Sequence, residues 1–315
     1  MPSVELRTEE QIISTWDRSH SVPMVSIRCQ TFNHADYIDD AIRGFLIQET
    51  SFPFEIVIHD DASTDGTSAI IKEYSDRYPR IIKPICQKEN QWSRGLRPMH
   101  FMDPVCKGKY VAMCEGDDYW TDPNKLTTQV EFLEENPDYV ISGHDAFIID
   151  ESGNRISDSK LPKAHKRDFS SQELIEGKAW ILTMSWVYRN IDLGEIPERN
   201  MVINGDYFFT SLIGHYGKSK YHTDVAPAAY RQHEGGIWSA LEPSEELEAM
   251  LNTFFWMYRY YKRIDERHCA DIYWAAYLKR LSRRASPITL QKIVFLSIRE
   301  KIGRLITALK NYFIN

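Results

Sequence analysis

Short apolar runs alternate with segments of helical periodicity along the first half of the chain. The apolar runs predict strands at residues 22–27, 54–58, 81–85 and 109–113. Between the first two runs, residues 35–48 place apolar side chains at helical spacing, and the next helical segment extends to about Arg77. This alternation predicts an α/β fold, in which a mostly parallel, twisted sheet carries helices on both faces.

The second half continues with less regular spacing. Helices are predicted at 125–135, 170–176 and 207–215, and strands at 139–143, 146–149, 183–189 and 226–231. Glu173 is placed to form a capping box with Ser170 or Ser171. Pro227 indicates that the last strand lies at a sheet edge, because proline cannot donate to a strand ladder. Residues 244–285 are helical and rich in aromatics, so we divide the chain into residues 1–240 and a C-terminal helical region, 241–315.

Polar side chains follow each predicted parallel strand at its carboxyl end. These side chains are Thr31 and Asn33, Asp60 and Asp61, Asn90 and Arg94, and Asp117 and Asp118. Parallel sheets bind ligands beyond the carboxyl ends of their strands, so we expect these groups to line one site.

The most acidic of these strand ends is Glu115-Gly116-Asp117-Asp118. Three carboxylates within four residues repel one another unless a cation lies between them, and Gly116 allows the sharp turn that brings them together. A hard divalent ion shared with a substrate's phosphates would suit this stretch. A solvated acidic turn without any ligand is the alternative, and these residues alone do not separate the two.

Composition restricts the class of protein. The 315 residues are 43% hydrophobic and 12% aromatic, enough for a full core, and the formal net charge of -7 disfavours a nucleic-acid partner. The five cysteines are odd in number and no pair has zinc-ligand spacing, which indicates reduced thiols in a cytoplasmic protein. We identify neither a signal-peptide core nor an apolar run long enough to span a membrane.

The last segment differs from the rest in charge. Residues 279–315 carry nine Lys or Arg and a single acid, Glu300, and after Pro287 apolar residues recur at helical spacing. Residues 287–315 could therefore form a helix that packs on the body, or a basic amphipathic helix on the inner face of an anionic cell membrane. Both interpretations stay open at this stage.

Three motifs together resemble a known family. They are Val25-Ser26-Ile27 with Thr31-Phe32-Asn33, then Asp60-Asp61-Ala62-Ser63-Thr64-Asp65-Gly66-Thr67, and then Gly108-Lys109-Tyr110 with Glu115-Gly116-Asp117-Asp118. In order and spacing, residues 22–240 resemble the inverting glycosyltransferases of family 2. The resemblance implies a GT-A-like fold that binds a nucleotide-diphosphate sugar.

The resemblance also implies roles on the donor side. Thr31 and Asn33 match residues that line the nucleotide, and Asp61 matches the acid that hydrogen-bonds the base. Asp60 either binds ribose or supports the turn, and Arg94 is assigned to the same donor side.

Metal ligands and a base are implied as well. Asp117 and Asp118 match an Asp-x-Asp-type signature, with Asp118 expected to contact the metal directly, and His233 matches a late histidine that reaches the metal or diphosphate. The ion would be Mn2+ or Mg2+, which sequence does not distinguish. Asp206 matches the catalytic base that takes the proton of the acceptor hydroxyl.

Two tryptophans in predicted loops, Trp120 and Trp238, are candidates for stacking on sugar rings, although tryptophans are more often core residues. The chain also departs from the family. The first strand continues as Arg28-Cys29-Gln30 where aliphatic residues and proline are usual, and Glu115 stands where aspartate is common. We therefore expect a different pocket floor.

The resulting hypothesis is a metal-dependent inverting glycosyltransferase. It would move a sugar, from a UDP-sugar by preference, to a glycan or an undecaprenyl-diphosphate-linked acceptor in O-antigen or capsule synthesis. A sugar nucleotidyltransferase is one alternative, but the turn 30–34 lacks the glycine and lysine of a phosphate loop. A non-catalytic nucleotide- or sugar-binding module is the other, and it would not need Asp206.

Overall fold

A seven-stranded sheet forms the centre of the molecule, in the strand order β3-β2-β1-β4-β8-β5-β9. The computed structural model describes residues 5–19, 21–236 and 241–282. The strands are β1 (Val25–Thr31), β2 (Phe54–Asp60), β3 (Ile82–Cys86), β4 (Tyr110–Met113), β5 (Tyr139–Gly143), β8 (Val187–Arg189) and β9 (Lys218–Tyr221). Only β8 runs antiparallel to its neighbours, so the predicted mostly parallel sheet is confirmed.

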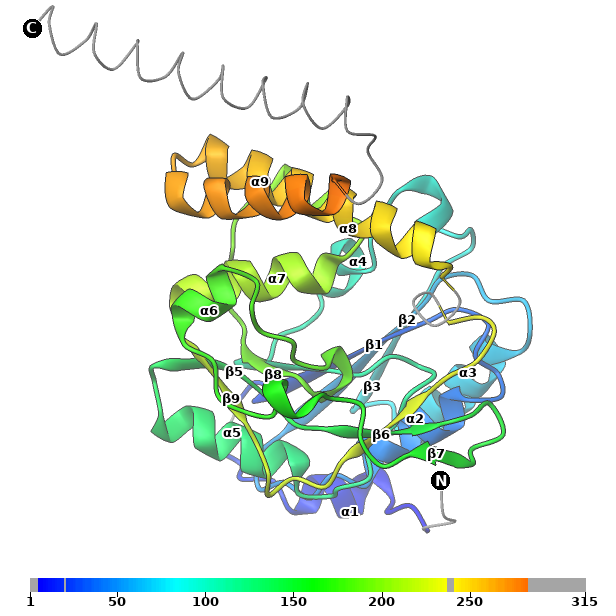
Figure 1. The fold of residues 1–315 in the computed structure, drawn as a ribbon. Helices are drawn as coiled ribbons and strands as arrows, with labels where there is room; N and C mark the ends of the chain where they lie inside the picture. Colours follow the sequence, from blue (N-terminus) through cyan, green and yellow to red (C-terminus); the bar gives the residue numbers. More distant parts are fainter. Residues whose placement is uncertain (1–4, 20, 237–240, 283–315) are drawn as a thin grey trace, which may run out of the picture.

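Helices cover both faces of this sheet (Figure 1). They are α1 (Glu9–Ser14), α2 (Ile38–Leu46), α3 (Thr67–Arg77), α4 (Met99–Met102), α5 (Lys125–Glu135), α6 (Ser171–Ile175), α7 (Gly205–Ile213), α8 (Pro243–Arg263) and α9 (Arg267–Leu281). Figure 1 shows α6, α7 and the α8–α9 pair on one side of the sheet and α1 and α5 on the other.

A second sheet of three strands has the order β10-β6-β7. Its strands are β6 (Ala146–Ile149), β7 (Arg155–Ser157) and β10 (Ala228–Arg231). As Pro227 predicts, β10 is an edge strand. A bridge between Tyr119 and Ala229 joins β10 to the turn after β4, so this sheet brings the residues after β10 to the end of β4.

Comparison of the observed elements with the predicted ones shows which elements the local sequence pattern predicts correctly. α5 and the capping box of α6, formed by Ser170 and Glu173, agree with prediction. The strand expected at 183–189 is instead a 3-10 turn (Thr183–Ser185) followed by β8. β7 and β9 were not predicted, because three- and four-residue strands carry little periodicity.

β1 carries a buried arginine at the position where the sequence departs from the family pattern. Arg28 forms an ion pair with Asp103 at 2.8 Å and donates to the hydroxyl of Tyr188 at 3.3 Å. These partners compensate the charge of Arg28, so its guanidinium can stay buried beside β1.

The α8–α9 pair packs on α7 through a separate apolar cluster, which includes Phe208, Leu212, Phe254, Met257, Tyr261 and Tyr273. Ile203 N donates to Asn252 Oδ1 at 2.9 Å and Asn204 N donates to Thr253 Oγ1 at 3.1 Å, so α8 also holds the segment that leads into α7. Whether the chain divides at residue 240 stays a prediction, and residues 287–315 with their two interpretations lie outside the described residues. No helix within the described ranges is both long and apolar enough to cross a bilayer.

α2 approaches the turn after β4 closely at Gly44. A Cβ atom on this residue would lie 2.9 Å from both the backbone nitrogen and the carbonyl oxygen of Trp120. Backbone atoms cannot move aside as a flexible side chain can, so only glycine fits this position.

We expect Gly44→Ala to lower the free energy of unfolding by about 1–3 kcal/mol through overpacking. This is the opposite of the usual effect within a helix, where alanine is more stable than glycine. Gly205→Ala is the matched control, since a Cβ there meets no atom within 4 Å. Urea unfolding followed by circular dichroism measures both. Equal stability of the two variants would show that α2 can move away from the turn.

Candidate active site

The turn after β4 lies against the end of β1. Gly116 N donates to Gln30 O at 3.0 Å, and a Cβ on Gly116 would lie 2.7 Å from Thr31 Oγ1. Thr31 is buried, and its hydroxyl has no hydrogen-bond partner among the residues that the structure describes. Thr31 therefore lies directly beside the acidic turn, in agreement with its expected position at the site, and its role toward a nucleotide stays a prediction.

Asp60 supports the turn after β2. Its carboxylate is fully buried, accepts hydrogen bonds from the hydroxyls of Ser63 and Ser68, and also accepts from Ser63 N at 3.2 Å. Both carboxylate oxygens are thus engaged inside the protein. This corrects the ribose-binding assignment in favour of the turn-supporting alternative.

Asn33 and Asp61 complete the neighbouring strand ends. Asn33 is exposed, has a φ of 55° and accepts from Thr64 N at 2.9 Å. Asp61 is buried and accepts from Gln91 N at 2.7 Å and from Trp92 N at 3.0 Å. Asp61 thereby fixes the loop that carries Trp92, and its role as partner of a base stays a prediction.

Three side chains from distant parts of the chain converge on one point. One ligand atom each of His34, Asp117 and His233 lies within 4.8 Å of the other two. His233 Nε2 is 3.0 Å from Asp117 Oδ2, and His34 Nε2 is 3.9 Å from the same oxygen. Asp117 Oδ1 is buried and accepts no hydrogen bond from any described residue, so this cluster has ligand capacity that these residues do not use.

The electrostatics of the cluster suit a cation ligand set. Burial lowers the pKa of the His34 imidazole, which favours the neutral form that can bind a metal. Burial opposes ionisation of Asp117, but the hydrogen bond from His233 and the nearby His34 outweigh it and lower the pKa of this carboxyl.

Asp118 contacts the backbone of β10. Its Oδ1 accepts from the backbone N–H of Arg231 at 2.8 Å, and it is 5% exposed. Burial and the charges of Asp117 and Glu115 raise its pKa well above the usual value. Among the described residues the three-ligand cluster includes Asp117 and not Asp118, and the direct contact of Asp118 with a metal stays a prediction.

Arg231 connects the parts of this site. Its guanidinium donates to Asp40 on α2 at 2.8 Å, to the carbonyl of Asp117 at 3.1 Å and to the carbonyl of Glu151 at 3.3 Å. Together with the bond from its backbone to Asp118, the residue fixes the acidic turn against α2 and β10.

Asp206 lies in the first turn of α7. Asn204 caps that helix by accepting from Tyr207 N at 3.1 Å, and Thr183 donates to Asp206 Oδ2 at 2.8 Å. The Asp206 carboxyl is accessible to solvent, yet the surrounding protein desolvates it and raises its pKa. Burial, Asp206 and Asp117 raise the pKa of Glu115 to about 8, which places Asp206 in the field of the acidic turn.

The remaining expected residues lie elsewhere. Trp120 is fully buried, its indole N–H donates to Met184 O at 2.7 Å, and Phe45 and Lys125 cover its ring, so a sugar cannot stack on it and that assignment is wrong. Arg94 is exposed and paired with Glu89 at 2.8 Å. Trp238 lies outside the described residues.

Sequence reasoning missed three residues of the site. His34 follows Asn33 in the polar turn after β1, and a ligand-type side chain at a strand end was a usable signal. Arg231 stands two residues before His233, but no local pattern shows that it would be buried. Thr183 lies in a segment that was predicted as a strand.

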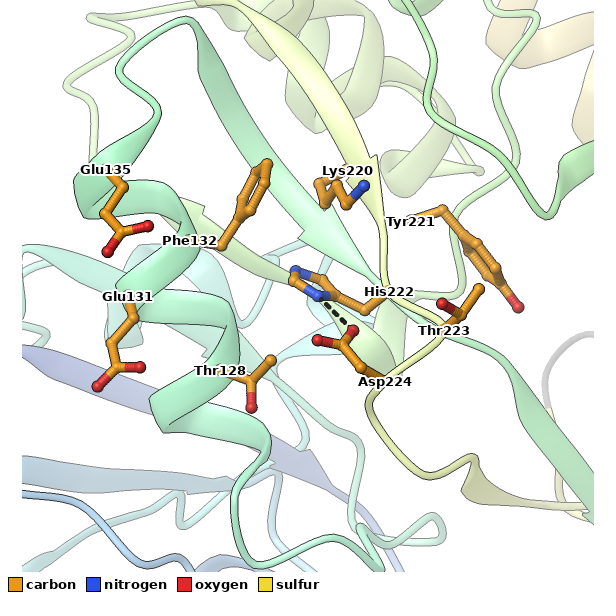
Figure 2. Close-up of a pocket in the computed structure, with 9 residues that line it drawn as sticks. All are labelled: Thr128, Glu131, Phe132, Glu135, Lys220, Tyr221, His222, Thr223 and Asp224. Atoms are coloured by element: carbon orange, nitrogen blue, oxygen red, sulfur yellow. Dashed lines mark hydrogen bonds and ion pairs between the residues drawn. The ribbon is translucent and has the colours of Figure 1, made fainter.

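A separate surface hollow lies between α5 and the segment made of the end of β9 and the residues that follow it (Figure 2). Its lining comprises Thr128, Glu131, Phe132, Glu135, Lys220, Tyr221, His222, Thr223 and Asp224. None of these belongs to the expected site, and His222 is paired with Asp224 at 3.1 Å, as the dashed line shows. The converging carboxylates and imidazoles, rather than this hollow, form the candidate active site.

Comparison with known proteins connects this geometry to a family. The model of the family "Glycosyl transferase family 2" matches residues 26–187. An uncharacterised protein of Mycobacterium tuberculosis is 38% identical over 218 residues, which cover 68% of this chain and 60% of that protein. The chain therefore matches less than two thirds of the length of this relative.

Two solved structures share the fold. Residues 1–349 of Staphylococcus aureus TarS, in complex with UDP-GlcNAc, match with a TM-score of 0.59 and 20% identity over 81% of this chain and 72% of that one. The mannosyltransferase PcManGT of Pyrobaculum calidifontis, in complex with GDP-Man and Mn2+, matches with a TM-score of 0.53 and 15% identity. The match covers 89% of this chain and 80% of that one. At these identities the similarity confirms the GT-A-like fold alone.

Removing the guanidinium of Arg231 should break its ion pair with Asp40 and its bonds to the carbonyls of Asp117 and Glu151. We expect Arg231→Met to lower the free energy of unfolding by about 3 kcal/mol, since removal of one member of a buried ion pair is strongly destabilising. Lys72→Met is the control, because it breaks an exposed pair with Asp76 and should change stability by less than about 1 kcal/mol. Similar losses in urea unfolding for both variants would contradict the connecting role of Arg231.

Proposed function

The chain belongs to glycosyl transferase family 2, and from this premise we propose that it is a metal-dependent, inverting glycosyltransferase. It transfers a sugar from a nucleotide-diphosphate donor to a hydroxyl of a glycan or lipid-linked acceptor, in the assembly of a surface polysaccharide such as O-antigen or capsule. One observation carries the proposal: the cluster of His34, Asp117 and His233 shares the end of β4 with a carboxylate field that reaches Asp206.

The donor side is proposed at the carboxyl ends of β1, β2 and β4. Thr31 and Asn33 lie there beside Asp61 and Asp117. A UDP-sugar is the preferred donor in this proposal, supported by the fold shared with TarS, whose structure contains UDP-GlcNAc.

The residues present fit a divalent cation. His34, Asp117 and His233 would hold it with two imidazole nitrogens and one carboxylate oxygen, and the buried, unpartnered Oδ1 of Asp117 supports this fit. Carboxylates suit Mg2+ and Mn2+ alike, whereas imidazole suits transition metals better, so we favour Mn2+ over Mg2+. When bound, such an ion would stabilise the negative charge that develops on the leaving diphosphate.

Asp206 acts as the general base in this proposal. Its carboxylate accepts the proton of the acceptor hydroxyl while the hydroxyl oxygen attacks the anomeric carbon and the nucleoside diphosphate leaves with the bonding electron pair. Thr183 donates to one carboxylate oxygen at 2.8 Å and so restricts the orientation of the carboxylate. A raised pKa makes Asp206 a stronger base once it is ionised. Attack without a covalent intermediate inverts the anomeric carbon.

The two alternative functions are supported less well. A nucleotidyltransferase would need cationic groups in the turn after β1, but Thr31, Phe32, Asn33 and His34 provide none at neutral pH, since burial lowers the pKa of His34. A non-catalytic module does not require the desolvated Asp206 carboxyl that Thr183 orients.

Replacement of the base tests the function directly. We expect Asp206→Asn to retain binding of UDP with Mn2+ but to lose transfer by about 10²–10⁴-fold, because asparagine keeps the bond to Thr183 and cannot accept the proton. The measurement is nucleotide release in the presence of a UDP-sugar and a glycan acceptor. Asp158→Asn, at an exposed position directly after β7, is the control and should keep wild-type transfer. Unchanged transfer by Asp206→Asn would remove this residue from the mechanism.

Nucleotide preference is tested on the wild type. Calorimetric titration of UDP, GDP and dTDP, each with Mn2+, Mg2+ or neither, should show metal-dependent binding that is strongest for UDP with Mn2+.

Removal of one imidazole tests the metal assignment without an activity assay. We expect His34→Ala to weaken Mn2+ binding by at least about tenfold, as read by the electron paramagnetic resonance signal of free Mn2+. His268→Ala, an exposed histidine on α9, should leave binding unchanged. Wild-type affinity in His34→Ala would exclude His34 as a ligand.

A further inference from the structure

Four large apolar side chains are exposed on two segments that lie on either side of Arg97. They are Trp92 (44% exposed), Leu96 (39%), Met201 (48%) and Ile203 (45%). We name these four residues together with Arg97 the Arg97 surface. Exposed apolar groups gathered in this way mark a binding site more often than scattered ones do.

Arg97 holds the two segments together. Its Nη2 donates to the carbonyl of Val202 at 2.8 Å, and its guanidinium carbon lies 4.1 Å from the centre of the Trp92 ring. Val202 is 2% exposed, whereas the residues before and after it are about half exposed. Met201 and Ile203 therefore present their side chains to solvent beside Arg97.

The backbone under this surface is fixed at both ends. Asp61 accepts hydrogen bonds from Gln91 N and Trp92 N, and Asn252 on α8 accepts from Ile203 N at 2.9 Å. The apolar side chains are thus exposed on a backbone held by buried or helical groups. A preorganised surface of this kind binds a ligand at a smaller entropic cost than a mobile loop would.

Arg97 carries a positive charge that no carboxylate balances within the described part of the chain. The neighbouring Arg94 pairs with Glu89 and Arg263 pairs with Glu198, but the hydrogen bond to Val202 is the single one that Arg97 donates from its side chain to a described residue. A guanidinium has five N–H donors in a fork that matches a phosphate. The remaining donors are available to an anion.

We propose that the Arg97 surface binds the acceptor, as an amphiphile whose phosphate pairs with Arg97 and whose apolar chain lies on Trp92, Leu96, Met201 and Ile203. This inference rests on the proposed function, since it names the acceptor class of the same site. Ile203 precedes Asp206 by three residues, so an acceptor bound here has its hydroxyl-bearing part close to the proposed base. An anion joined to an apolar chain matches both the charge and the aliphatic side chains of the surface, whereas a neutral glycan would leave the charge of Arg97 without a counter-ion.

The test uses the full chain and dodecyl phosphate below its critical micelle concentration. We expect calorimetry to show binding that is at least about tenfold tighter than for inorganic phosphate or dodecanol, because the two partial interactions add. Arg97→Gln keeps a donor for Val202 but removes the charge, and it should weaken binding by about tenfold or more. The double variant Met201→Ser with Ile203→Ser should weaken it to a similar degree. Both variants should retain the wild-type midpoint of thermal unfolding.

Two matched controls should bind dodecyl phosphate like the wild type. Arg77→Gln on α3 removes another arginine that lies over an aromatic ring, at 5.3 Å from the centre of Tyr78, and Ile156→Ser on β7 removes an apolar side chain that is 56% exposed. Absence of binding to the wild type, or equal affinity in Arg97→Gln, would overturn the proposal.

A second arm separates a single acceptor molecule from a membrane surface. If the Arg97 and Met201/Ile203 variants lose binding to phosphatidylglycerol vesicles but keep binding of monomeric dodecyl phosphate, the surface contacts a bilayer and the proposal is wrong. UDP binding with Mn2+ is measured on the same variants and should be unchanged. Loss of UDP binding in the wild type would count against the proposed function, whereas loss of dodecyl phosphate binding alone counts against the Arg97 surface.

Discussion

The structure depends on how it accommodates three carboxyl groups that are crowded and desolvated at the end of β4. Glu115, Asp117 and Asp118 cannot all be ionised there without compensation, and each carboxyl has a different environment. Asp117 is stabilised as an anion by two imidazoles, Asp118 accepts one backbone bond, and Glu115 keeps a raised pKa. The position of Asp117, and with it the ligand capacity of the site, follows from this division.

That compensation comes from distant parts of the chain. His34 follows β1, whereas Arg231 and His233 lie at the end of β10, so the second sheet positions them beside the acidic turn. The bridge between Tyr119 and Ala229 fixes β10 against this turn. The acidic turn can therefore adopt its final electrostatic state only after both sheets have formed, so the chemistry of the site is coupled to the completed tertiary structure.

The periodicity of the sequence was sufficient for the parallel half of the sheet and for α5, because long apolar strands and an amphipathic helix have strong local patterns. It was also sufficient to bring Thr31, Asp61 and Asp117 to one edge, since parallel strands end together. It failed for β7 and β9, which are too short for periodicity. It also failed for Trp120, whose burial depends on Gly44 of α2, and for Arg231, whose burial depends on Asp40; partners so far away in sequence leave no local trace.

The hydrogen bonds from Ile203 and Asn204 to α8 have a consequence for how such an enzyme can diversify. They make Asn252 and Thr253 part of the support of α7, although neither residue belongs to the proposed catalytic or metal-binding groups. A substitution on this helix can shift the start of α7 by a fraction of an ångström and leave every residue of the donor site unchanged. Under the proposed function, the helical pair thus offers evolution a place to alter which acceptor is used without altering which donor is bound.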